Sequence, residues 1–236
     1  SALEWISKAK LKHGGWAAGS HARQSVFDPH AVSSDPATTA MVAMALLRTG
    51  NTPTTGKYSA NLSLATEYLL KQIEAADAQT LNITNQTATQ PQVKLGQNID
   101  VVLATQYLTN LMDYITNNQT LKTRVSKSLD KCVVKIQHAQ SENGSIKGAG
   151  WAGVLQSSFA TNALESAKAA GASVDDEKLE RYKNYQKGNY DAKTNSVATG
   201  DGAGVMLYSI SGTARSTARE ASIAKDKIAK AKKEGK

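Results

Sequence analysis

The 236-residue chain has little of several things that mark particular protein classes. It has one cysteine, Cys132, which excludes an internal disulfide framework and any zinc site built from several cysteines. No apolar run approaches the ~20 residues that a bilayer-spanning helix needs, so we expect no membrane span. Only four prolines interrupt the chain, which leaves room for long helices. Since no segment shows the two-residue hydrophobic alternation of a strand, we predict an all-α protein.

Positive charge is concentrated at the C-terminal end. The formal net charge is +8, and residues 225–236 contain six lysines and two acidic residues, which gives that segment a net charge of +4. Lysines at this position complement the negative end of a helix dipole. No aromatic-rich basic stripe accompanies them, so we favour a solvated terminal helix and expect no nucleic-acid partner.

Two kinds of helix alternate along the chain. In residues 36–49, Asp35 suits the N-cap, Pro36 the first helical position and Gly50 the end, and the body is apolar nearly all round, as in a fully buried helix. Residues 122–139 instead carry one apolar stripe opposite lysines, which predicts an amphipathic helix on the outside. The predicted outer helices cover 2–10, 64–75, 122–139 and 175–186, the predicted inner helices cover 36–49, 97–115, 154–170 and 203–214, and a last basic helix covers 218–234.

The unit of one outer and one inner helix recurs every ~50–60 residues, a spacing typical of stacked helical repeats. We therefore predict four to five antiparallel helical hairpins arranged as an α/α toroid or an open arc, with outer amphipathic and inner buried helices alternating. Residues 1–217 form this domain in our prediction, and residues 218–236 form a basic C-terminal helix.

A glycine-and-aromatic pattern recurs where an outer helix passes to an inner one. It is best formed in Gly14-Gly15-Trp16, recurs with a preceding glutamine but with Ile146 at the aromatic position in residues 134–146, and is shortened in residues 185–190. Over residues 2–190 this pattern resembles the glutamine-and-tryptophan repeats of squalene and hopene cyclases, in the terpene-cyclase and prenyltransferase-β superfamily. The resemblance implies an α/α toroid in which the glycine lets the chain reverse, the aromatic packs between hairpins and the glutamine bonds a helix end.

The acid motif of that family is incomplete in this chain. Class II cyclases protonate a double bond with crowded carboxylates in an Asp-x-Asp-Asp-Thr-Ala motif. When Thr39-Ala40 is aligned with the end of the motif, Asp35 falls on its first acid, but Ala37 and Thr38 replace the acidic pair. We therefore predict that Asp35 caps a helix and that the protein does not start a cyclisation by protonation.

The family's metal chemistry is also not expected. Asp130-Lys131-Cys132 has the spelling of the prenyltransferase zinc pair, but it lies in a predicted outer helix, where a cysteine on the apolar stripe is a small core residue. We predict no metal and no cofactor.

The candidate site is the mouth of a central cavity, where the loops that lead into the inner helices meet. These loops cover residues 17–35, 147–153 and 191–204, and the helix N-termini behind them direct positive dipole ends at the mouth, which favours an anionic group. The candidate ligand-binding residues are Trp16, His21, Arg23, Asp28, His30, Asp35, Trp151 and Asp201.

Several functions fit this scaffold, since a fold does not define an activity. We favour a non-catalytic module that binds an apolar or anionic small ligand, or a protein partner or second copy of the chain through the flanks of an open arc. The alternatives are a divergent enzyme acting on an isoprenoid or a polysaccharide, and a purely structural repeat domain. An aromatic-lined apolar cavity would indicate the isoprenoid, and a polar groove with paired carboxylates would indicate the sugar.

Overall fold

A computed structural model describes residues 1–148, 153–188, 190–191, 193–194, 196–197 and 206–234. It confirms the predicted all-α fold. The α-helices are α1 (Ala2–Lys8), α2 (Pro36–Arg48), α3 (Ser59–Ala75), α4 (Gln90–Leu95), α5 (Ile99–Leu111), α6 (Gln119–His138), α7 (Gly153–Ala169), α8 (Asp176–Gly188) and α9 (Met206–Lys233). Short 3-10 turns cover His21–Arg23, Pro29–Ala31 and Met112–Tyr114, and β1 (Tyr190–Asp191) pairs with β2 (Ser196–Val197) in an antiparallel ladder.

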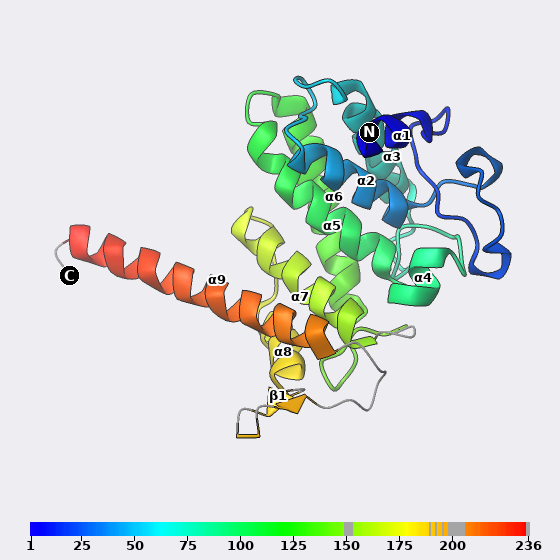
Figure 1. Cartoon of the computed structure of the whole chain (residues 1–236). Helices are drawn as coiled ribbons and strands as arrows, with labels where there is room; N and C mark the ends of the chain where they lie inside the picture. The colour runs from blue at the N-terminus through cyan, green and yellow to red at the C-terminus, as the bar shows by residue number, and fades with distance from the viewer. Residues whose placement is uncertain (149–152, 189, 192, 195, 198–205, 235–236) are drawn as a thin grey trace.

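The helices lie in two layers (Figure 1). The inner row runs α2, α5, α7 and α9, each packed on the next, with α2 and α9 at its two ends. The outer helices α3, α6 and α8 each pack on the inner helix that precedes them in the chain. The inner helices run parallel, so the loops that lead into them lie at one end of the row, which we call the loop end.

The predicted difference between inner and outer helices is clear in α5 and α6. In α5, nine of thirteen residues are buried, as expected of a helix covered on most sides. In α6 the buried apolar residues follow one stripe, which includes Leu129, Cys132 and Ile136. The prediction that residues 36–49 are buried on every side is wrong: seven of the thirteen residues of α2 are buried and Met41 is 43% exposed, because α2 lies at the end of the inner row. No helix in the described part of the chain combines the length and the hydropathy that crossing a membrane requires.

Two hydrogen bonds made by residues of the repeat pattern join neighbouring elements. Trp16 is 3% exposed, and its Nε1–H donates a hydrogen bond of 2.8 Å to the carbonyl of Ile6. Gln137 at the end of α6 accepts a 2.7 Å hydrogen bond from the backbone N–H of Asp175, just before α8 begins. Gly14 makes the first reversal with φ +92°, and a Cβ there would lie 2.8 Å from the carbonyl oxygen of Leu64.

Two predicted helix boundaries are wrong because a residue outside the helix acts on them. The helix predicted for 64–75 begins at Ser59, and Asn51 Oδ1 accepts the N–H of Tyr58, the residue before this helix, at 2.8 Å. The helix predicted for 97–115 is preceded by the separate helix α4, and Gly96 divides the two with φ +121°. A Cβ at Gly96 would overlap the side chain of Gln156.

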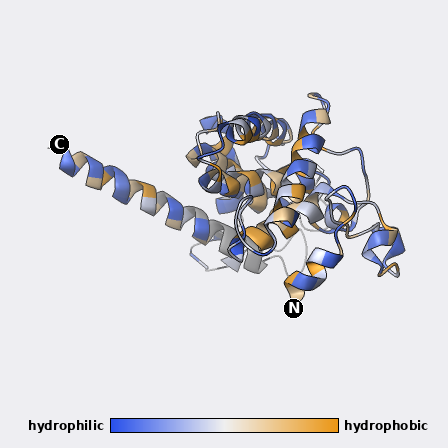
Figure 2. Ribbon diagram, turned by 90° about the horizontal axis from the view of Figure 1, so that it is seen from above, coloured by the Kyte–Doolittle hydropathy of each residue, from blue (hydrophilic) through white to orange (hydrophobic). Residues whose placement is uncertain are grey.

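The third difference concerns the C-terminal part of the chain. The helices predicted for 203–214 and 218–234 are one continuous helix, α9, so the predicted division at 217/218 falls inside it. Residues 203–205 lie outside the described residues. Figure 2 shows that α9 projects from the body, and residues 221–230 are all exposed.

Candidate functional site

Buried side chains join the inner helices at the loop end. Asp100 in the first turn of α5 accepts the N–H of Ala37 in α2 at 3.0 Å, and Gln156 in α7 accepts the N–H of Asn98 before α5 at 3.0 Å. The first turn of a helix leaves such amides without intrahelical partners, so α5 caps the start of α2 and α7 caps the start of α5.

Asp35 is the N-cap of α2, as predicted, and is 1% exposed. Its Oδ1 accepts the N–H of Thr38 at 2.7 Å, and its Oδ2 accepts the Thr38 hydroxyl at 2.8 Å and the N–H of Ala18 at 3.2 Å. Burial raises the pKa of Asp35 from 3.8 to about 6, against the lowering effect of the Thr38 hydrogen bonds and with a further rise from the charge of Asp100.

Asp100 is fully buried and completes a pair of neighbouring carboxylates. Its Oδ2 accepts hydrogen bonds from Gln92 Nε2 at 2.8 Å and Asn82 Nδ2 at 3.0 Å. Burial raises the pKa of Asp100, while the hydrogen bonds from Gln92, Asn82 and Ala37 oppose that rise. Asp100 was not among the predicted site residues, although an acid between Ile99 and Val101 in a mainly apolar helix is the signal that identifies it.

Two adjoining hollows lie over this pair. One has a volume of about 610 Å³ and lies between residues 19–33 and 85–89, and the other has about 430 Å³ and lies between residues 80–98 and 147–148. They share Gln86 and Thr87, so we treat them as one polar groove. Its lining is Gly19, Ser20, Arg23, Ala31, Val32, Ser33, Thr80, Leu81, Asn82, Thr84, Asn85, Gln86, Thr87, Ala88, Thr89, Gln92, Gln97, Asn98, Lys147 and Gly148.

Hydroxyl and amide side chains dominate this lining. Its two charged residues are Arg23 in the larger hollow and Lys147 in the smaller one. The groove can therefore donate and accept hydrogen bonds and attract an anion. Among the described residues that line it there is no carboxylate and no aromatic ring.

Three of the candidate residues lie at or beneath the groove. Arg23 lines it. Asp35 is bonded to the N–H of Ala18, which precedes the lining residues Gly19 and Ser20. His21 is half-buried beside it, with Nδ1 3.2 Å from Gln90 Oε1.

The other candidates lie elsewhere. Trp16 is buried between hairpins, while Asp28 and His30 are exposed, 3.4 Å apart, and Asp28 caps the Pro29–Ala31 turn. Trp151 and Asp201 lie outside the described residues. Ligand contact by any of these residues stays a prediction.

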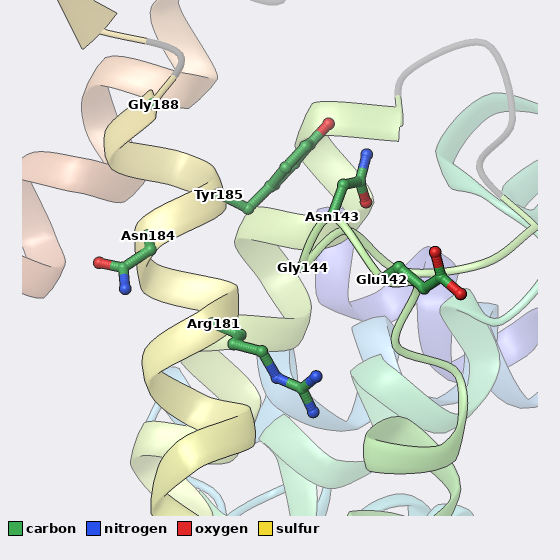
Figure 3. A pocket seen from close by; sticks show the side chains of 7 residues that line it. All are labelled: Glu142, Asn143, Gly144, Arg181, Asn184, Tyr185 and Gly188. Carbon is green, nitrogen blue, oxygen red and sulfur yellow. The ribbon is translucent and has the colours of Figure 1, made fainter.

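A third hollow, of about 420 Å³, lies between α8 and the turn at 142–144 (Figure 3). Tyr185 reaches from α8 toward Asn143, and Arg181 and Glu142 lie at its other end. A Cβ at Gly144 would lie 2.5 Å from the carbonyl oxygen of Arg181, so this glycine allows the turn to approach α8 closely.

Cys132 lies in the hydrophobic core, as predicted. Cys132 is fully buried, and burial raises its pKa to about 12, so the side chain remains a thiol. Within the described residues, no three His, Cys, Asp or Glu side chains form a group that could hold a metal ion.

No protein-family model, no curated protein and no solved structure matches this chain. The resemblance to the cyclase repeats therefore stays a prediction, and the chemistry of the loop end is the basis for interpreting function.

Proposed function

We propose that the chain is a non-catalytic ligand-binding module on a cyclase-like scaffold of helical hairpins, with its ligand in the polar groove. One observation carries this proposal. The oxygens of Asp35 and Asp100, the carboxylates beneath the groove, accept six hydrogen bonds between them and are buried. They are occupied in joining helices and loops, so they are poorly placed to act as the acid and base of a reaction.

The lining favours a polar ligand that carries an anionic group. Hydroxyls and amides along the groove match a ligand rich in hydrogen-bonding groups, and Arg23 and Lys147 can each pair with a carboxylate or phosphate. An isoprenoid would require an apolar lining, and cleavage of a polysaccharide would require two accessible carboxylates. Both alternatives are therefore less well supported than binding alone.

The test is a titration of the isotope-labelled protein, followed by amide chemical shifts, with neutral oligosaccharides, carboxylated oligosaccharides and prenyl diphosphates. We expect the carboxylated oligosaccharides to shift amides of residues 19–23 and 84–89. Arg23→Ala and Lys147→Ala should each weaken binding about tenfold, the effect of losing one charged hydrogen bond.

The matched controls are Arg48→Ala, at the opposite end of α2, and Lys127→Ala on the exposed side of α6, neither of which should change binding. Binding of prenyl diphosphates at other residues, or turnover of any of the three probes, would contradict the proposal.

A second candidate, protein binding, is favoured by the projecting half of α9. Ile223 and Ile228 are 47% and 56% exposed there, and a partner that covers them would bury apolar surface. Light scattering over a hundredfold range of protein concentration tests self-association through α9. A constant monomer mass would exclude a second copy of the chain as the partner.

A further inference from the structure

The two buried carboxylates hold separate parts of the groove lining. Asp35 binds the N–H of Ala18, which precedes Gly19 and Ser20 of the larger hollow, a segment that is also bonded to residues 88–90. Asp100 binds the side chains of Asn82 and Gln92, which line the smaller hollow. Gln92 in turn donates from the same Nε2 to the carbonyl of Gln86 at 2.9 Å, so its position fixes the centre of the groove.

We propose that Asp35 and Asp100 hold a single proton at mildly acidic pH and that uptake of this proton loosens one wall of the groove. Two neighbouring buried carboxylates repel each other when both are ionised, so the first proton relieves the repulsion. This link between proton uptake and the groove lining concerns the site of the proposed function, but it does not depend on which ligand the groove binds.

The hydrogen bonds assign the proton to Asp35. A protonated carboxyl must donate one hydrogen bond, and five of the six donors around the pair are N–H groups, which cannot accept. The sixth is the Thr38 hydroxyl, which can turn and accept from Asp35 Oδ2. Asn82 and Gln92 cannot help by an amide flip, because their carbonyl oxygens already accept backbone N–H groups.

The other titratable groups near the pair are Tyr68 and His13. Tyr68 donates to the carbonyl of Ser34, and burial raises its pKa to about 12, so it stays neutral. His13 Nε2 lies 2.6 Å from Ser34 Oγ, one residue before Asp35, and must be controlled for. Among the described residues, no lysine or arginine forms an ion pair or a hydrogen bond with either carboxylate.

Protonation should have opposite global and local effects. The pKa of Asp35 is about 6 in the folded protein against an ordinary 3.8, so the folded state binds the proton more tightly than the unfolded state. The contribution of Asp35 to the free energy of unfolding should therefore fall as pH rises from about 4 to about 6 and stay at the lower value above pH 6. Locally, the protonated Oδ2 becomes a donor, and the Ala18 N–H loses a charged acceptor.

The experiment is hydrogen exchange of the Ala18, Gly19 and Ser20 amides between pH 4.5 and 8, corrected for intrinsic rates, beside denaturant unfolding at each pH. Protection at Ala18 should fall about tenfold below pH 6, the worth of one hydrogen bond to a charged group. Asp35→Asn keeps a good N-cap but removes the proton site, so the fall in Ala18 protection should disappear. The stability of the wild-type protein relative to Asp35→Asn should rise below pH 6.

Two controls separate the pair from its surroundings. Asp28→Asn changes an exposed capping carboxylate in the same loop, and His13→Gln removes the neighbouring imidazole; both should retain the transition. A transition that persists in Asp35→Asn, disappears in His13→Gln, or alters stability without altering Ala18 protection would overturn the proposal. Ligand binding is not measured, so this result is independent of the test of the proposed function.

Discussion

The loop end is held together by buried polar side chains, whereas residues 221–230 of α9 are exposed. At the loop end, Asp35, Asp100 and Gln156 each hold backbone or side-chain donors of another element. Among its described contacts, α9 is joined to α7 by the 2.8 Å hydrogen bond from Arg219 to Ser166 Oγ, and its residues 221–230 are exposed. Tertiary contacts therefore specify the loop end, while the projecting half of α9 is helical through its alanine, lysine and glutamate content.

The largest effect should come from the centre of the loop end. Asp100→Ala leaves the Ala37 N–H and the amides of Asn82 and Gln92 buried without their acceptor. We expect a loss of about 3–5 kcal/mol in the free energy of unfolding, measured by denaturant titration. Asp113→Ala, at an exposed carboxylate, is the control and should change it by less than about 0.5 kcal/mol.

A matched pair of glycines tests the packing between α4 and α7. Gly96→Ala both strains a backbone at φ +121° and overlaps Gln156, and should cost about 3 kcal/mol. Gly171→Ala strains a backbone at φ +93° with open space around it and should cost about 1 kcal/mol. Equal losses in thermal unfolding would show that the contact with Gln156 adds nothing.

A smaller effect is expected where α9 meets the body. Glu165 in α7 lies 3.4 Å from Lys183 in α8, and its charge also acts on Arg215 in α9. Glu165→Ala should destabilise the protein by about 1–2 kcal/mol, because the cations it leaves can turn partly to water. Hydrogen exchange of the backbone amides should increase more in residues 214–220 than in α2. An equal increase in both regions would indicate that Glu165 does not hold α9 in particular.

The smallest effect should come from the projecting half of α9. Ile228→Ser removes an apolar side chain that is 56% exposed, so the free energy of unfolding should change by less than about 0.5 kcal/mol. A loss above 1 kcal/mol in dilute protein would show that Ile228 is covered in solution, and a loss that appears only at high concentration would indicate a second copy.

Much of the helical layout could be predicted because its signals are local. Asp35, Pro36 and Gly50 mark α2 within a few residues of each end, and the stripe through Cys132 identifies α6 as an outer helix. Prediction failed where the partner lies outside the helix. Asn51 accepts the N–H of the residue before α3, and Gln156 packs where Gly96 divides α4 from α5.

The candidate site was predicted only in part for the same reason. Arg23 could be placed in a loop at the loop end, but nothing local shows that residues 84–89 form the other side of a groove. Asp35 could be identified as a cap, whereas its pairing with Asp100 depends on contact between α2 and α5.

The sequence by itself determined the all-α class, the alternation of inner and outer helices and the cap of α2, since hydrophobic periodicity and capping act within one or two turns. Only the tertiary structure decided the polar groove and the carboxylate pair beneath it. Their hydrogen bonds join Ala18 to Asp35 across 17 positions and Ala37 to Asp100 across 63 positions, and such pairs meet only when separate hairpins stack.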